Sequence, residues 1–97
     1  MSTTVVNGKE YLIDNILADF LIQQKSSSNI EFHGSNGKDQ IFVQFKNGSS
    51  YIYKGVNEAD IKEMNEAESI GKFVHALSKK YASEKIPKRV VVEQNIT

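Results

Sequence analysis

The sequence predicts an α+β fold: a three-stranded antiparallel meander followed by two helices, with an added N-terminal helix and a C-terminal strand. Apolar and polar residues alternate over residues 40–46 and run into Asn47-Gly48, and such a pair after an alternating segment is a strong short-range hairpin signal. The next strand places Tyr51 and Tyr53 on one face. Farther along, apolar residues recur at helical spacing, at Ile70, Phe73, Val74, Leu77 and Tyr81.

The N-terminal extension, residues 1–25, is expected to add a helix. Residues 3–6 and 11–13 have strand character and flank Asn7-Gly8, which fits either a short hairpin or one strand entering a turn. Asp14 is a suitable N-cap for a helix over about residues 15–25. Its apolar stripe consists of Ile16, Leu17, Phe20 and Leu21. The serines at 26–28 end this helix.

The three strands of the meander are predicted at residues 29–33, 40–46 and 50–54. Asn57 is the predicted N-cap of the first following helix, and Ser69 is that of the second. Pro87, the only proline, marks a break. A last strand is expected at residues 90–92, within a C-terminal extension over residues 87–97.

Length and composition limit the classes of function. The chain has 97 residues, 39% hydrophobic and 25% charged, which fits one globular domain over residues 1–97. Twelve basic residues balance twelve acidic ones, whereas nucleic-acid-binding modules usually carry a positive excess. The absence of cysteine excludes disulfides and thiolate chemistry. No signal-peptide pattern or bilayer-length apolar run occurs, so we expect a cytoplasmic protein with no membrane partner.

A series of short motifs carries a family resemblance. In order, they are Ser27-Ser28-Asn29-Ile30, Phe45-x-Asn47-Gly48, Tyr51-x-Tyr53, Val56, Ala67-x-Ser69-x-Gly71-Lys72-Phe73 and Tyr81. This series resembles the KTSC domain, named for its occurrence at the C-terminus of some lysyl-tRNA synthetases, over about residues 26–81. The resemblance implies the meander and two helices. Nothing in it implies catalysis, and RNA binding is a suggested role. The chain departs from the usual pattern at Asn57, His75 and Ser78, and the last of these often is basic in the family.

The turn at Asn47-Gly48 leaves two registers open for Tyr51 and Tyr53. A two-residue loop would place the tyrosines away from Ile41, Val43 and Phe45, whereas a bulged loop with Gly48 in the left-handed region would place them on that apolar face. Alternation favours the bulged loop, with Gln44, Lys46, Ser50 and Lys54 on an outer face. The tyrosines are then either core residues or a ligand platform.

The start of the last helix is the best candidate for anion binding. Free N–H groups at a helix N-terminus attract phosphate, and a glycine allows close approach. The predicted site therefore combines Ser69 and Gly71 with the basic residues Lys72, His75 and Lys79, and with the sole arginine, Arg89. The competing interpretation is that Ser69 only caps the helix and that the lysines are solvated.

No pattern indicates an enzyme. His33 and His75 do not form a metal-binding pattern with carboxylates, and no nucleophile elbow occurs. The acidic residues at 58–68 are interpreted as a solvated helix face. We therefore expect neither catalysis nor a cofactor.

The leading functional hypothesis is non-catalytic binding of a phosphate-bearing, nucleotide-like small molecule, with sequestration of a nucleotide signal, as in phage anti-defence proteins, as one role. Local cations, aromatics and zero net charge suit a compact anion better than a polymer backbone. The alternatives are an RNA-binding accessory module and a protein-interaction module that uses residues 90–92 as an edge strand. Small domains often bury their extensions on a partner, so a homodimer or higher homo-oligomer is expected.

Overall fold

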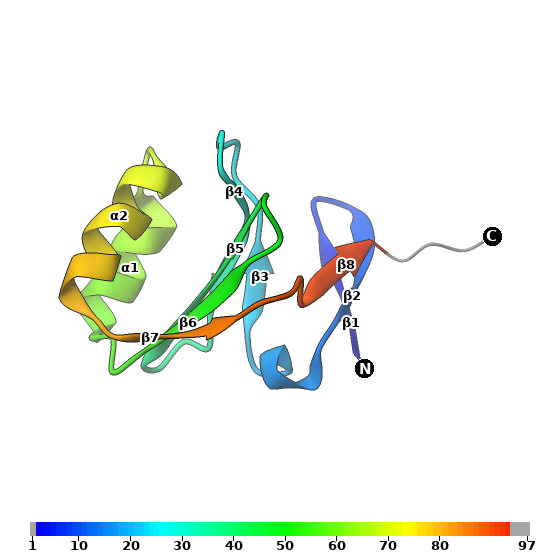
Figure 1. Ribbon diagram of the computed structural model, residues 1–97, viewed down its shortest axis with the longest axis horizontal. Coiled ribbons are helices and arrows are strands. Elements are labelled where there is room, and N and C mark those ends of the chain that lie inside the picture. The colour runs from blue at the N-terminus through cyan, green and yellow to red at the C-terminus, as the bar shows by residue number, and fades with distance from the viewer. Residues whose placement is uncertain (1, 94–97) are drawn as a thin grey trace.

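The computed structural model describes residues 2–93 and arranges them in three layers (Figure 1). A five-stranded antiparallel sheet of order β3-β4-β5-β6-β7 forms the middle layer. Two helices cover one face of this sheet, and a three-stranded antiparallel sheet of order β1-β2-β8 covers the other. The strands are β1 (Ser2–Val6), β2 (Lys9–Ile13), β3 (Leu21–Gln23), β4 (Ile30–Ser35), β5 (Gln40–Phe45), β6 (Ser50–Lys54), β7 (Ser83–Ile86) and β8 (Val91–Glu93), and the helices are α1 (Glu58–Glu66) and α2 (Ile70–Lys80).

The predicted architecture is therefore wrong in its main feature. The protein is mostly β, with two antiparallel sheets, and the three expected strands are only the centre of a larger sheet. β3 extends this sheet on one side and β7 on the other. Local patterns do not reveal such additions, because residues 83–86 show no apolar alternation and three of the four are exposed.

The predicted N-terminal helix over residues 15–25 is also wrong. Asp14 does cap a helix, since its side chain accepts a hydrogen bond from the N–H of Ile16, but that 3-10 helix ends at Leu17. Leu21, on the expected stripe, is 69% exposed, whereas its neighbours Phe20 and Ile22 are buried. Burial that alternates with period two is typical of a strand, and this segment becomes β3.

The two Asn-Gly pairs form different turns. At Asn7-Gly8 both residues have positive φ, 51° and 81°, as a two-residue hairpin loop between β1 and β2 requires. At Asn47-Gly48 only the glycine has positive φ, 95°, and the N–H of Phe45 donates to the carbonyl of Ser49. This second loop is the bulged form.

The bulged loop sets the register of β5 and β6. Tyr51 pairs with Val43 and Tyr53 with Ile41, so the tyrosines share the apolar face that the helices cover. The opposite face is not the solvated surface that alternation suggests. Gln44 and Ser50 on it are buried, because β8 and the segment that leads into it lie over them.

Two apolar cores result from the three layers. One lies between the two sheets and includes Leu17, Phe32, Phe42, Ile52 and Val91. The other lies between the five-stranded sheet and the helices and includes Ile41, Met64, Ile70, Val74 and Leu77. The middle sheet is therefore buried on both faces.

The C-terminal strand occurs as β8, which pairs antiparallel with β2. The part of the predicted C-terminal extension after Glu93, residues 94–97, lies outside the described residues.

Candidate binding groove between the two helices

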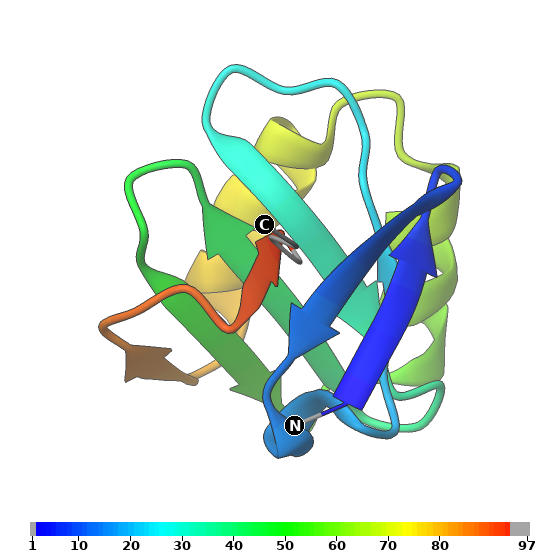
Figure 2. The same cartoon turned by 90° about the vertical axis from the view of Figure 1, so that its right-hand side faces the viewer.

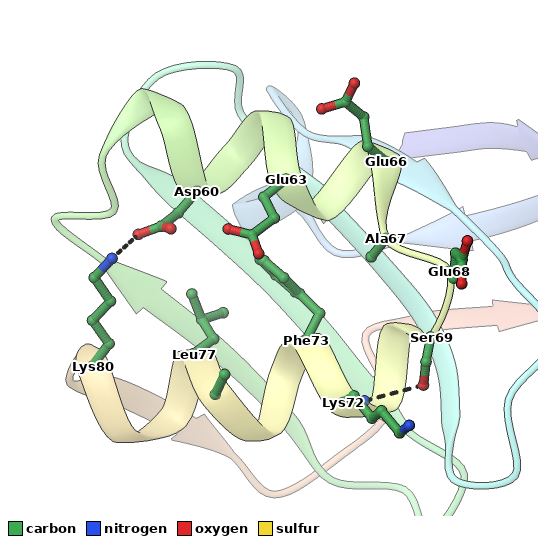
Figure 3. A pocket seen from close by; sticks show the side chains of 11 residues that line it. Asp60, Glu63, Glu66, Ala67, Glu68, Ser69, Lys72, Phe73, Leu77 and Lys80 are labelled. Atoms are coloured by element: carbon green, nitrogen blue, oxygen red, sulfur yellow. Dashed lines mark hydrogen bonds and ion pairs between the residues drawn. The ribbon is translucent and has the colours of Figure 1, made fainter.

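An open groove of about 580 Å³ runs between α1 and α2 on the surface of the helical layer (Figure 3). Phe73 and Leu77 of α2 point into it, and the side chain of Glu63 on α1 reaches toward the Phe73 ring. Ser69 and Lys72 lie at one end, and Asp60 and Lys80 lie at the other. Its lining comprises Asp60, Glu63, Glu66, Ala67, Glu68, Ser69, Lys72, Phe73, Ala76, Leu77 and Lys80.

Local sequence signals position both walls of the groove. Asn57 caps α1 by accepting a hydrogen bond of 2.8 Å from the N–H of Asp60, and Ser69 caps α2 by accepting one of 3.3 Å from the N–H of Lys72. Lys25 holds the C-terminal end of α1, because its Nζ donates to the carbonyls of Ala67 at 2.9 Å and Asn65 at 3.3 Å. These hydrogen bonds therefore hold the start of each helix and the end of α1, where the chain leads into α2.

One end of the groove is closed by a hydrogen-bonded cluster. Asp60 accepts hydrogen bonds from Lys80 Nζ at 2.8 Å and from the Tyr81 hydroxyl at 2.6 Å. These bonds, first that of Lys80 and then that of Tyr81, lower the pKa of the Asp60 carboxyl. The Asp60 carboxylate thus links α1 to the C-terminal end of α2, and it forms an ion pair with Lys80.

The remaining charges of the groove are mostly negative. With Asp60 and Lys80 paired, the charged lining residues that remain are Glu63, Glu66, Glu68 and Lys72. Between these charges lies an apolar floor to which Phe73 and Leu77 contribute, together with Ala67 and Ala76. The groove therefore combines an apolar floor with an acidic rim.

The predicted site residues are only partly brought together. Ser69 and Lys72 line the groove, and the other six predicted residues do not. Gly71 faces the loop between β3 and β4 instead: a Cβ there would lie 3.4 Å from Asn29 Oδ1 and 3.9 Å from Ser27 Oγ. His75 and Lys79 are exposed on α2, outside the groove lining.

The aromatic and arginine candidates lie elsewhere. Tyr53 is 3% exposed in the core beneath the helices, where burial raises the pKa of its hydroxyl. Tyr51 is half-buried and packs edge-on against Phe45, with 5.6 Å between ring centroids. Arg89 Nη2 donates to the carbonyl of Lys46 at 2.6 Å, and its Nε lies 3.2 Å from Glu31 Oε1. That these residues bind a ligand stays a prediction.

The interpretation of the acidic residues at 58–68 as a solvated helix face did not place any of them in a groove, whereas Asp60, Glu63, Glu66 and Glu68 line one. Asp60 and Glu63 are spaced by three residues on α1, and Phe73, Ala76, Leu77 and Lys80 follow helical spacing on α2. Each stripe is visible in the sequence. That the two stripes face each other across a groove depends on the packing of both helices on the same sheet.

Among residues 2–93, no cluster of three or more histidine, cysteine or acidic side chains is arranged to hold a metal ion. In the same part of the chain, no helix is both long and apolar enough to cross a membrane.

The layers and the groove define a small two-sheet α+β domain with a paired-helix surface. The family model of the KTSC domain matches residues 26–81, from the loop before β4 to the end of α2, and this is more than half of the chain. The chain therefore belongs to the KTSC domain family, which confirms the resemblance seen in the sequence. A search of curated proteins found none that matches this chain.

Proposed function

We propose that this protein is a non-catalytic interaction module whose α1–α2 groove binds a basic polypeptide segment with an apolar anchor. The observation that carries the proposal is one groove that combines an apolar floor with glutamates that form no ion pair within residues 2–93. Grooves of this kind bind amphipathic segments by burying apolar side chains and surrounding them with complementary charge.

The charge of the rim favours a cationic ligand. Among the described lining residues, Glu63, Glu66 and Glu68 outnumber the one unpaired cation, Lys72, so a lysine or arginine entering the groove gains attraction from several carboxylates. A phosphate group would meet repulsion from the same carboxylates. The groove geometry thus supports a protein-interaction role better than the nucleotide hypothesis.

The apolar floor of the groove would supply binding free energy for an apolar side chain of the ligand. Phe73 is only half-buried although it lies at the centre of the helix pair, and Ala76 beside it is exposed. An apolar side chain placed over these residues would remove further area from water, worth about 25 cal/mol for each Å². The groove volume of about 580 Å³ is within the range of roughly 300–1,000 Å³ typical of sites for compact ligands, so a few anchoring side chains fit.

A nucleotide-like ligand is the alternative. Ser69 and Lys72 lie together at one end of the same groove, next to the N-terminus of α2. The phosphate would bind at that end beside Lys72, where Glu66 and Glu68 of the acidic rim also lie, so both classes of ligand belong in one experiment.

The test is calorimetric titration with three probes: a synthetic helical peptide of leucine and lysine, its leucine and glutamate counterpart, and a panel of mono-, di- and cyclic nucleotides. We expect binding of the leucine-lysine peptide only, and Glu63→Lys should weaken it about tenfold or more, because an attraction becomes a repulsion. The matched control is Glu58→Lys, which makes the same charge change on α1 but outside the groove lining.

The control should keep an affinity within about twofold of the wild type, with melting temperatures used to correct for the folded fraction. If both variants lose affinity equally, nonspecific charge attraction explains the binding and the groove is not the site. Binding of nucleotides that Lys72→Ala abolishes, with no peptide binding, would replace the proposal by the alternative.

A further inference from the structure

The three-stranded sheet has an open edge at the end of the molecule opposite to the groove. β1 is its outermost strand (Figure 2), and its sequence from Ser2 to Val6 contains no charged residue, glycine or proline. Val5 on this strand is 63% exposed. Edge strands are normally protected by charges, prolines, bulges or a covering segment, because their free backbone groups pair readily with another strand.

The other sheet edges are protected. The outer side of β8 is covered by the side chain of Gln44, which bonds the N–H and carbonyl groups of Val91 at 2.9 Å each. β7 carries the charged residues Glu84 and Lys85, and β3 has only three residues. β1 is thus the one uncharged edge of five residues in the described part of the chain.

We infer that β1 pairs antiparallel with β1 of a second copy of this chain, about a two-fold axis at Thr4. The two-residue loop closes on the pair Val6 and Lys9, and pairs that exchange hydrogen bonds alternate from there along the hairpin. The backbone groups of Thr4 therefore face β2, and those of Thr3 and Val5 point out from the edge. Within residues 2–93, the outward backbone groups of Thr3 and Val5 have no hydrogen-bond partner.

The two-fold arrangement satisfies these groups. Thr3 lies opposite Val5 of the partner subunit, and Val5 lies opposite Thr3 of the partner subunit, so each of these pairs exchanges both of its hydrogen bonds. Thr4 lies opposite Thr4 of the partner subunit as a pair without hydrogen bonds, in which side chains approach most closely. The alternation of the ladder is unbroken.

Self-complementarity identifies a second copy as the partner. An uncharged strand meets itself without like-charge repulsion across the axis. Val5, Leu12 and Val92 lie on the same outward face of the sheet by register, and the last two are half-buried. The two-fold axis joins this apolar strip to its copy, as an isologous interface does.

The chain has no cysteine, so single cysteines test the register directly. Thr4→Cys should form a covalent dimer on mild oxidation, because opposed residues without hydrogen bonds lie about 4.5 Å apart between Cα atoms. Thr3→Cys is the matched control on the same strand. The two cysteines at position 3 would be offset by two residues, roughly 7 Å along the strand. They should therefore cross-link at least about tenfold more slowly.

Sedimentation of the full chain gives a second measurement. Val5→Pro removes an outward N–H and should yield a monomer while leaving the β1–β2 bonds intact, whereas Val5→Thr keeps the ladder and should stay dimeric. The inference is overturned if the wild type sediments as a monomer, or if Thr3→Cys cross-links as fast as Thr4→Cys. A monomer that still binds the leucine-lysine peptide would remove this inference and leave the proposed function intact.

Discussion

At the scale of single residues, His33 lies in β4 on the face of the middle sheet that the helices cover, since it pairs with Val43. Its side chain is completely buried, and neither ring nitrogen bonds to another described residue. Burial, with a smaller contribution from the charge of Lys25, lowers the pKa of His33 to about 4. A neutral imidazole is therefore part of the folded core.

This burial predicts acid sensitivity. Between pH 6.5 and 4 the unfolded chain binds a proton at this position and the folded chain does not, so the free energy of unfolding should fall as pH is lowered. The loss should approach about 3 kcal/mol over this range, at about 1.4 kcal/mol for each pH unit. Urea denaturation at several pH values measures it.

The change His33→Leu should remove this part of the pH dependence and leave stability at pH 7 unchanged or higher, because it replaces two unbonded nitrogens with apolar atoms. His75→Gln, at the exposed histidine, is the control and should keep the full dependence. Equal slopes for wild type and His33→Leu would show that other groups cause the acid sensitivity.

At the scale of elements, β8 is attached through one buried side chain as well as through β2. Gln44 Oε1 accepts from the N–H groups of Val90 at 3.0 Å and Val91 at 2.9 Å, and its Nε2 donates to the Val91 carbonyl and to Glu31. A glutamine on the middle sheet thus replaces a strand that would otherwise flank β8.

Replacing Gln44 by methionine should destabilise the protein by about 3 kcal/mol or more, because buried backbone groups lose their partners and each such loss costs about 1–3 kcal/mol. Gln40→Met makes the same change at a half-buried position in the same strand and should cost less than about 1 kcal/mol. Urea denaturation compares the two, and similar losses would mean that the bonds of Gln44 contribute little.

Local signals predict some elements well. The caps at Asn57 and Ser69 and the apolar stripe of α2 mark both helices, and alternation with Gly48 predicts the bulged turn. These features depend on residues a few positions apart. The same short-range signals predict that Ser69 and Lys72 lie together at the start of α2, and both residues line one end of the groove.

Long-range pairing accounts for what local signals do not predict. Leu21 to Gln23 become a strand because β4 offers an edge, and a side chain at Gly34 would come within 2.3 Å of the Leu21 carbonyl oxygen. Gln44 has the alternation of a solvent-facing residue, and its burial involves contacts with residues 90 and 91, which are distant in the sequence. The acidic rim of the groove likewise depends on how the two helices pack.

At the scale of the whole molecule, the family segment is not a complete layer structure. Residues 26–81 contain β4, β5, β6 and both helices but lack both edge strands of the middle sheet and the entire second sheet. Phe32, Phe42 and Ile52 would then lose the cover of the three-stranded sheet. The extensions complete one of the two apolar cores.

A peptide of residues 26–81 should therefore not unfold cooperatively and should bind a hydrophobic dye, whereas the 97-residue chain should show one cooperative transition. Thermal melting followed by circular dichroism, together with dye fluorescence, distinguishes the two outcomes. A sharp transition of the peptide near that of the full chain would show that the second sheet is dispensable for folding.

Residues 2 and 93 both belong to the three-stranded sheet, and the helices lie at the other end of a molecule 42 Å long (Figure 1). A linker, resin or neighbouring domain joined before residue 2 or after residue 93 would thus lie on the face of the middle sheet that is opposite to the helices. Tethering would orient the domain with its helices outward, toward solvent. Immobilisation through a terminal tag should then present the groove to a passing ligand without steric obstruction, whichever end carries the tag.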